Sequence, residues 1–165
     1  MMELEKIYRG MENGTEVIQE NFSKLETRVN DKRVNGAWNT MEKIIITSSS
    51  FAVPIGEQEV GTTLVKTSDN TGITIVKNGM YFISSSVSIH MSSKGSWADL
   101  RVCVNNVPKL TSSAQIALGT MVEISAIGGL YLKENDVITV RYVGDSNLNN
   151  TNSNVRNLKL IVSEL

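Results

Sequence analysis

Cysteine, histidine and long apolar runs are nearly absent from this chain. Of its 165 residues, one is cysteine and one is histidine. This excludes an internal disulfide, a cysteine-based zinc cluster and a metal site built on several histidines. Cys103 lies in the strand-like run LRVCVNN, where we expect a small buried apolar side chain. Without a run of about 18 apolar residues we expect no bilayer-spanning helix, and the segment MMELEKIYRG lacks the apolar core of a secretory signal.

Neither a strong net charge nor a catalytic motif is present. The formal net charge is −1, so no overall field attracts nucleic acid or an anionic membrane. The aromatic residues do not alternate with a basic run. No G-x-S-x-G motif and no glycine-rich phosphate loop occurs, and a nucleophile has only His90 as a possible histidine base. We therefore expect no nucleic-acid partner, no cofactor and no enzyme activity, and we place His90 at a surface or interface.

The composition changes after residue 46. Charged side chains are concentrated before this point, whereas Ser, Thr, Asn, Val and Ile dominate after it. We interpret the first region as helix and connector and the second as β structure. The predicted organisation is an N-terminal segment at 1–14, a helix at 15–34, a linker at 35–46 and a β domain at 47–165.

An amphipathic helix is predicted from about residue 14 to about residue 32. Asn13 is a suitable N-cap, and Glu16 completes a capping box. The apolar positions follow the spacing of a heptad seam: Ile18, Phe22, Leu25 and Val29. A lone helix of this length is barely populated in water. We favour self-association along the seam, and packing of the helix on its own domain is the alternative.

Short strands separated by turn residues follow the helix. Their pattern predicts a sandwich or barrel of antiparallel strands. The even positions between Phe82 and His90 are serines, and such a small polar face suits solvent or a neighbouring subunit. Gly128-Gly129 is interpreted as a bulge or bend. The predicted strands are 43–47, 51–55, 62–66, 72–76, 80–90, 98–104, 115–118, 121–127, 136–142 and 158–162.

The stretch DSNLNNTNSN places oxygen-bearing side chains at alternate positions from Asp145 to Thr151. This spacing is that of an EF-hand calcium loop. However, Asn150 stands where that loop needs glycine, and Arg156 stands where it needs glutamate. We therefore predict a polar loop without a metal ion.

The opening IYRGMENGTEVIQENFSKLE contains Tyr-Arg-Gly-Met-x-Asn-Gly followed by the predicted helix. It resembles the N-terminal segment of baseplate receptor-binding proteins of siphophages that infect Gram-positive bacteria, the lactococcal type above all. The resemblance implies that residues 1–14 dock the protein to other baseplate proteins, with Tyr8, Arg9 and Met11 as the contact residues. It also implies that the helices at 15–34 associate as homotrimers.

Four later stretches, NGMYFISSSVSI, ADLRVCVNN, GGLYLKENDVITVRY and NLKLIVSEL, are similar to the C1q/TNF-like jelly roll. Asn106 and Asn135 stand where that family has glycine, and asparagine tolerates the left-handed backbone of such turns. The resemblance implies a mainly β fold with an antiparallel, trimeric jelly-roll head. The matching residues are Gly79, Tyr81, Leu132, Asp136 and Val137.

Together the two resemblances imply a phage tail or baseplate adhesion protein. It would be made in the bacterial cytoplasm, be incorporated in the virion, and bind a host cell-wall polysaccharide through its head. The alternative is a structural or accessory baseplate protein without a saccharide ligand. A saccharide-degrading enzyme would need a carboxylate pair in a groove, and the sequence marks no such pair.

Carbohydrate sites combine an aromatic ring with hydrogen-bonding groups. Trp97 follows a polar turn, although a core or subunit-interface position is equally compatible with it. Asp99 and Arg101 are equally compatible with a structural ion pair across strands. The candidate ligand-binding residues are His90, Trp97, Asp99, Arg101, Tyr142, Asp145 and Asn147.

Overall fold

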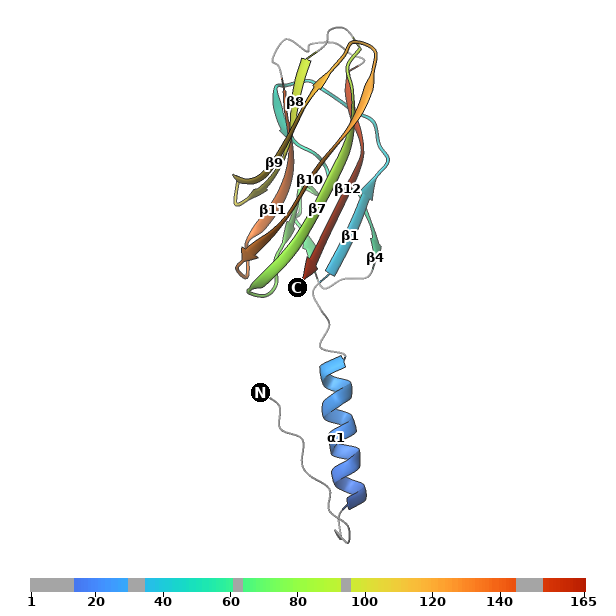
Figure 1. Ribbon diagram of the computed structural model, residues 1–165, viewed down its shortest axis with the longest axis vertical. Helices are drawn as coiled ribbons and strands as arrows, with labels where there is room; N and C mark the ends of the chain where they lie inside the picture. Colours follow the sequence, from blue (N-terminus) through green and yellow to red (C-terminus); the bar gives the residue numbers. More distant parts are fainter. Residues whose placement is uncertain (1–13, 30–34, 61–63, 93–95, 145–152) are drawn as a thin grey trace. The chain divides into compact units, whose positions relative to one another are not determined.

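The structure is a computed structural model that describes residues 14–29, 35–60, 64–92, 96–144 and 153–165 (Figure 1). The chain divides into two compact units, Met1–Arg33 and Val34–Leu165. The first unit contains one helix, and the second contains the strands. The predicted docking residues Tyr8, Arg9 and Met11 lie outside the described residues.

Helix α1 (Gly14–Val29) begins at Gly14 and carries Glu16 in its first turn. A negative side chain is favourable there because it faces the positive end of the helix dipole. Ile18 and Phe22 of the predicted seam are 42% and 62% exposed, whereas Val17 is buried. The side chains of Leu25 and Val29 lie outside the described set. Self-association of this helix therefore stays a prediction, for which Ile18 and Phe22 leave apolar surface.

Val34–Leu165 forms a sandwich of two six-stranded sheets in which every strand pair is antiparallel. This confirms the predicted mainly β sandwich. Sheet A has the order β10 (Met121–Leu132), β7 (Gly79–His90), β12 (Asn154–Glu164), β1 (Asn35–Thr40), β4 (Glu57–Val60), and β2 (Ile44–Ile45) pairs with β12. Sheet B has the order β5 (Val65–Lys66), β6 (Gly72–Thr74), β11 (Val137–Gly144), β8 (Ser96–Val104), β9 (Val107–Ile116), and β3 (Ser50–Ala52) pairs with β11.

The segment predicted as a linker, 35–46, instead contributes β1 and β2 to sheet A. Strand β1 pairs with β12 along its whole length and with β4 on its other side. Its short sequence NGAWNT has one large apolar side chain, Trp38, so its periodicity is weak. Trp38 is 1% exposed, and a Cβ at Gly36 would lie 2.1 Å from its ring. Long-range pairing and the burial of Trp38 thus make this segment a strand rather than a linker.

Strand β9 also differs from its prediction. The structure extends it over Val107–Ile116, whereas the sequence predicts a strand at 115–118. Most side chains of its run KLTSSAQ are not buried, so polar residues are tolerated there. Pairing with β8 along its length makes the segment a strand. The chain turns directly after it, where Gly119 has a φ of 71°.

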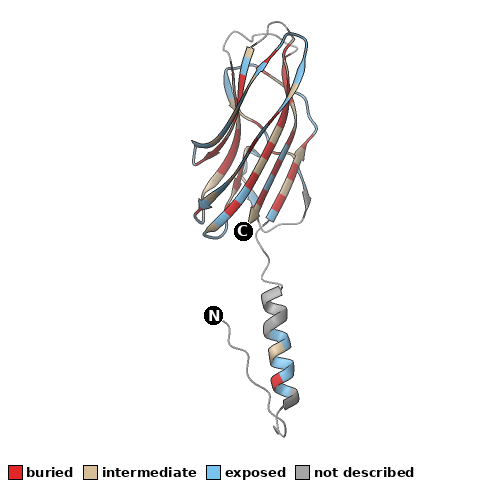
Figure 2. Ribbon diagram, in the orientation of Figure 1, coloured by how far each residue is buried: buried red, intermediate tan, exposed pale blue. Residues whose placement is uncertain are grey.

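The core lies between the two sheets, and along most of β7 buried residues alternate with more exposed ones (Figure 2). On β7, the odd positions from Tyr81 to Ile89 point inward and are buried, and the even positions point outward. This confirms the two faces predicted for that strand. The largest fully buried side chains are Trp38, Tyr81 and Tyr142.

Asparagine residues form the turns that the jelly-roll pattern assigns to glycine. Asn105 and Asn106 join β8 to β9 with φ values of 50° and 66°, and Asn135 has a φ of 69°. Two consecutive positive φ values match a type I′ hairpin turn. Asp136 accepts a hydrogen bond from Asn105 Nδ2 at 2.7 Å and one from the Lys133 N–H at 2.8 Å. The predicted left-handed turns are confirmed, and Asp136 joins two of them.

Gly128 and Gly129 do not form the predicted bulge. Strands β10 and β7 pair without a register shift through both residues. Gly128 instead makes room for a side chain of the opposite sheet, because a Cβ there would lie 2.6 Å from Leu110 Cδ2. The glycine therefore serves packing across the sandwich rather than a bend.

Candidate functional site

Strand β8 presents a row of chemically distinct side chains on the outer face of sheet B. Its even positions from Ala98 to Val104 enter the core, so its odd positions point outward. Trp97 is 43% exposed at the start of this row. Asp99 and Arg101 follow on the same face, about 7 Å apart by the rise of a strand. The row thus places an indole ring beside a carboxylate and a guanidinium group.

Asp99 is the best-anchored polar side chain of this row. It is 7% exposed, and its Oδ2 accepts hydrogen bonds from Arg101 Nε at 3.1 Å and from Arg101 Nη2 at 2.6 Å. Its Oδ1 accepts a bond from Ser113 Oγ on β9 at 2.6 Å. The ion pair is therefore made within one strand and not across strands. Because Asp99 holds Arg101, both groups are preorganised.

A second arginine lies beside the pair. Arg141 on β11 is directly opposite Arg101, and its Nη2 donates to Ser50 Oγ at 3.4 Å. Two like charges in this position destabilise each other unless a carboxylate offsets them, and Asp99 does so. Cys103 is buried next along the row, as predicted, and burial raises the pKa of its thiol, while Arg141 and Arg101 act in the opposite direction.

The other predicted ligand residues are elsewhere. His90 ends β7 and points to the outer face of sheet A, on the opposite side of the sandwich from Trp97. Tyr142 is fully buried in the core, with its ring centroid 5.3 Å from that of Phe51. It therefore cannot contact a surface ligand. Asp145 and Asn147 lie outside the described residues.

The outer face of sheet A carries an apolar patch. Ile127 on β10 and Ile161 on β12 flank Ser84 of β7, and Tyr131 lies opposite Met80. The members are 39% to 63% exposed, and they are Met80, Phe82, Ile127, Tyr131 and Ile161. Contiguous exposed apolar side chains on one sheet face mark an interaction surface.

Charged and polar groups occupy the same face beyond this apolar patch. Ser88 of β7 lies between Glu123 on β10 and Arg156 on β12. Arg156 Nε and His90 Nδ1 are buried atoms without a hydrogen-bond partner among the described residues. A hydrogen-bond partner from another molecule would therefore stabilise such buried polar atoms.

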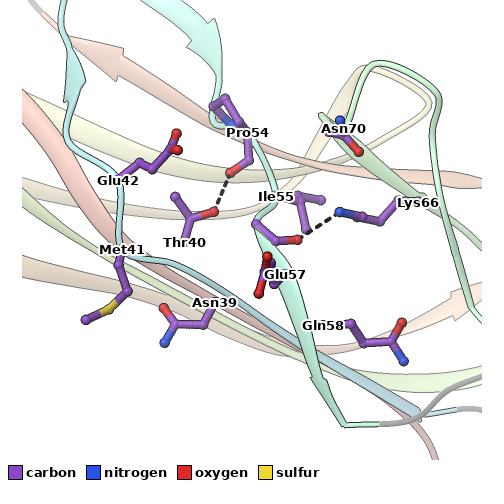
Figure 3. A pocket seen from close by; sticks show the side chains of 11 residues that line it. Asn39, Thr40, Met41, Glu42, Pro54, Ile55, Glu57, Gln58, Lys66 and Asn70 are labelled. Carbon is purple, nitrogen blue, oxygen red and sulfur yellow. Dashed lines mark hydrogen bonds between the residues drawn. The ribbon is translucent and has the colours of Figure 1, made fainter.

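A groove of about 600 Å³ lies at the edge of the sandwich (Figure 3). It is lined by residues 39–42 after and within β1, residues 54–58 leading into β4, Lys66 of β5 and Asn70 of the β5–β6 turn. Its volume falls in the range of small-molecule sites, about 300 to 1,000 Å³. Glu42 and Glu57 in its lining are both exposed.

Sequence reasoning missed this groove because its four segments are joined only by the fold. No motif marks Gly56, although its role is specific: a Cβ there would lie 2.1 Å from the Asn39 carbonyl oxygen. Within the described residues, no cluster of three His, Cys, Asp or Glu side chains is placed to hold a metal ion. No helix of the described chain has the length and apolar character needed to cross a membrane.

Comparison with known proteins supports the fold. No family model and no curated protein matches the sequence. Among solved structures, murine APRIL aligns with 81% of this chain and 100% of its own, at 14% identity and a TM-score of 0.60. The globular domain of the zebrafish complement 1qA protein aligns with 81% of this chain and 98% of its own, at 10% identity and a TM-score of 0.62. The β unit therefore adopts the C1q/TNF-like jelly-roll fold.

Proposed function

We propose that this protein is a phage tail or baseplate adhesion protein whose trimeric head binds a host cell-wall saccharide reversibly, without catalysis. The Tyr-Arg-Gly-Met-x-Asn-Gly segment supports attachment to a baseplate, with the virion as the location. The observation that carries the adhesion proposal is the outer row of β8, where Trp97 is 43% exposed beside the fixed Asp99–Arg101 pair.

This row has the parts that a saccharide site needs. An exposed indole offers an apolar plate with a polar N–H edge, against which the C–H face of a sugar ring can stack. Arg101 offers donors whose direction is already set by its hydrogen bonds to the nearly buried Asp99. Preorganised groups lose less entropy on binding than mobile ones.

A homotrimer is supported by the outer face of sheet A. Its apolar patch, Met80, Phe82, Ile127, Tyr131 and Ile161, is a surface that another copy of the head can cover. The exposed Ile18 and Phe22 of α1 supply a second contact. Three weak saccharide sites on one trimer would bind a polymer far more tightly than one site.

The test is binding of the labelled full-length protein to Gram-positive host cells. Saturable binding that purified cell-wall polysaccharide competes away supports adhesion. Absence of binding to every host strain on which the phage grows contradicts it. That second result would favour a structural baseplate protein, for which the apolar patch on sheet A is a contact surface toward other virion proteins.

A further inference from the structure

Several hydrogen bonds hold the walls of the groove in place. The Ile55 N–H donates to the Asn70 carbonyl oxygen at 2.7 Å, which joins the chain before β4 to the β5–β6 turn. Lys66 Nζ donates to the Gly56 carbonyl oxygen at 3.0 Å across the same gap. Thr40 Oγ1 donates to the Pro54 carbonyl oxygen at 3.2 Å (Figure 3). The groove is thus formed before any ligand arrives, which reduces the entropy cost of binding.

Backbone and side-chain hydrogen bonds together hold the turn that carries Asn70, among them one from the Asn70 N–H to the Thr67 carbonyl oxygen at 3.0 Å. Asp69 accepts hydrogen bonds from Thr67 Oγ1 at 2.5 Å, Thr71 Oγ1 at 2.8 Å and the Thr71 N–H at 3.0 Å. Asn70 itself has a φ of 56°, a left-handed conformation that asparagine tolerates. The position of the Asn70 side chain at the groove is therefore determined by the turn.

The groove offers hydrogen-bonding groups of both kinds. Asn39, Gln58 and Asn70 contribute side-chain amides, and Glu42 and Glu57 contribute carboxylates. A sugar hydroxyl both donates and accepts hydrogen bonds, so amides and carboxylates together match it.

Apolar surface is present in the same groove. Met41 is 76% exposed and lines it together with Pro54. A flexible thioether adapts its shape to a neighbouring apolar surface. The combination of polar groups and a small apolar wall fits the alternating hydroxyl and C–H surfaces of a pyranose.

The charge of the groove selects among saccharides. Two carboxylates, Glu42 and Glu57, and one ammonium group, Lys66, line it, and Lys66 is already bound to the Gly56 carbonyl oxygen. The lining is therefore net negative, which disfavours a phosphate or carboxylate group and favours an amine. This contrasts with the β8 row, in which Arg101 lies opposite Arg141 of β11.

We infer that the groove is a second saccharide site, which takes a short uncharged or amine-bearing sugar segment and rejects anionic ones. The inference rests on the proposed function for its ligand class, a surface saccharide. The inference adds the place where one part of that ligand binds and the charge that this part carries. A polymer could then contact the head at two separate places, the groove and the Trp97 row.

The test is a chemical-shift titration of the isotope-labelled full-length protein. The probes are the methyl glycosides of glucose, galactose, rhamnose, N-acetylglucosamine and glucosamine, with glycerol phosphate as the anionic probe. We expect at least one glycoside to shift the amide signals of Gly56, Glu57 and Asn70, and glycerol phosphate to leave them unchanged. A panel in which no glycoside shifts these signals, or in which glycerol phosphate binds here more tightly, overturns the inference.

Two variants locate the site. Asn70→Gly combined with Glu57→Gln removes two lining groups and keeps the turn, because glycine accepts the φ of 56°. We expect this variant to need about tenfold more glycoside to shift the groove signals, and Leu118→Ala, at an exposed apolar side chain outside both proposed sites, to titrate as the wild type does. A double variant that also titrates as the wild type does overturns the groove site and leaves the adhesion proposal intact. Cell binding without any shift of the groove signals has the same meaning. Shifts of the groove signals without cell binding contradict the adhesion proposal alone.

Discussion

Arg101 and Asp99 form an ion pair within strand β8, with 2.6 Å between Arg101 Nη2 and Asp99 Oδ2. Because the two residues are separated by one position, they share the outer face of sheet B. The pair satisfies a carboxylate that is nearly buried and keeps the guanidinium group beside Trp97 in one orientation. It therefore links the stability of the sheet to the proposed saccharide site.

Replacing Asp99 with alanine should destabilise the head by about 1 to 3 kcal/mol, since it removes charge-assisted hydrogen bonds. It also leaves Arg101 and Arg141 opposite each other without a counter-charge. Urea denaturation measures the change. Glu134→Ala, at an exposed position, is the control and should stay within about 0.5 kcal/mol of the wild type. Equal values for the two variants would contradict the role of Asp99.

Trp97→Ala should weaken binding to host cells by about tenfold or more, because the exposed ring is the apolar plate of the proposed site. Trp97→Phe should retain part of the binding. Flow cytometry with labelled protein measures both variants. Leu118→Ala changes another exposed apolar side chain, 58% exposed, in the β9–β10 turn, and should bind as the wild type does. Full binding by Trp97→Ala would show that the saccharide site lies elsewhere on the protein.

Ile127→Arg should break up the proposed trimer, since it places a charge in the apolar patch of sheet A. Light scattering should then fall from about three times 18.1 kDa toward the mass of one chain. Val107→Arg alters a side chain that is 53% exposed on β9 of the other sheet. It should leave the mass unchanged. A wild-type protein that is monomeric at micromolar concentration would refute the trimer.

Hydrogen bonds from Thr67 and Thr71 lower the pKa of Asp69 from its ordinary value of 3.8 to about 2. The folded protein therefore binds this proton less readily than the unfolded chain. The stabilisation is fully present above pH 3.8 and is lost as the pH falls through about 2. A carboxyl-carbon NMR titration should show this pKa, and Thr71→Val should raise it. A wild-type value near 3.8 would contradict the hydrogen bonds of this turn.

Gly128→Val should destabilise the head by about 1 to 3 kcal/mol, because the added side chain overlaps Leu110 of the opposite sheet. Leu110→Ala in the same chain should recover part of this loss, since it frees the space. Thermal unfolding of the two single variants and the double variant measures the coupling. Strictly additive effects would show that the two residues do not compete for one volume.

Local patterns were sufficient where burial alternates strongly along one strand. The two faces of β7 follow from such alternation. The asparagine turns were predictable because their backbone conformation depends on the residues in the turn itself. Strand β1 was not predictable, because its pairing partners, β12 and β4, supply the order that its own sequence lacks.

The sequence by itself determined the fold class, the alternation of β7, and the turns at Asn106 and Asn135. Each of these depends on residues close together in the chain. The tertiary structure decided that Tyr142 is buried, that His90 faces away from Trp97, and that Gly128 accommodates Leu110. It also created the groove, whose four segments come together only through the order and register of the two sheets.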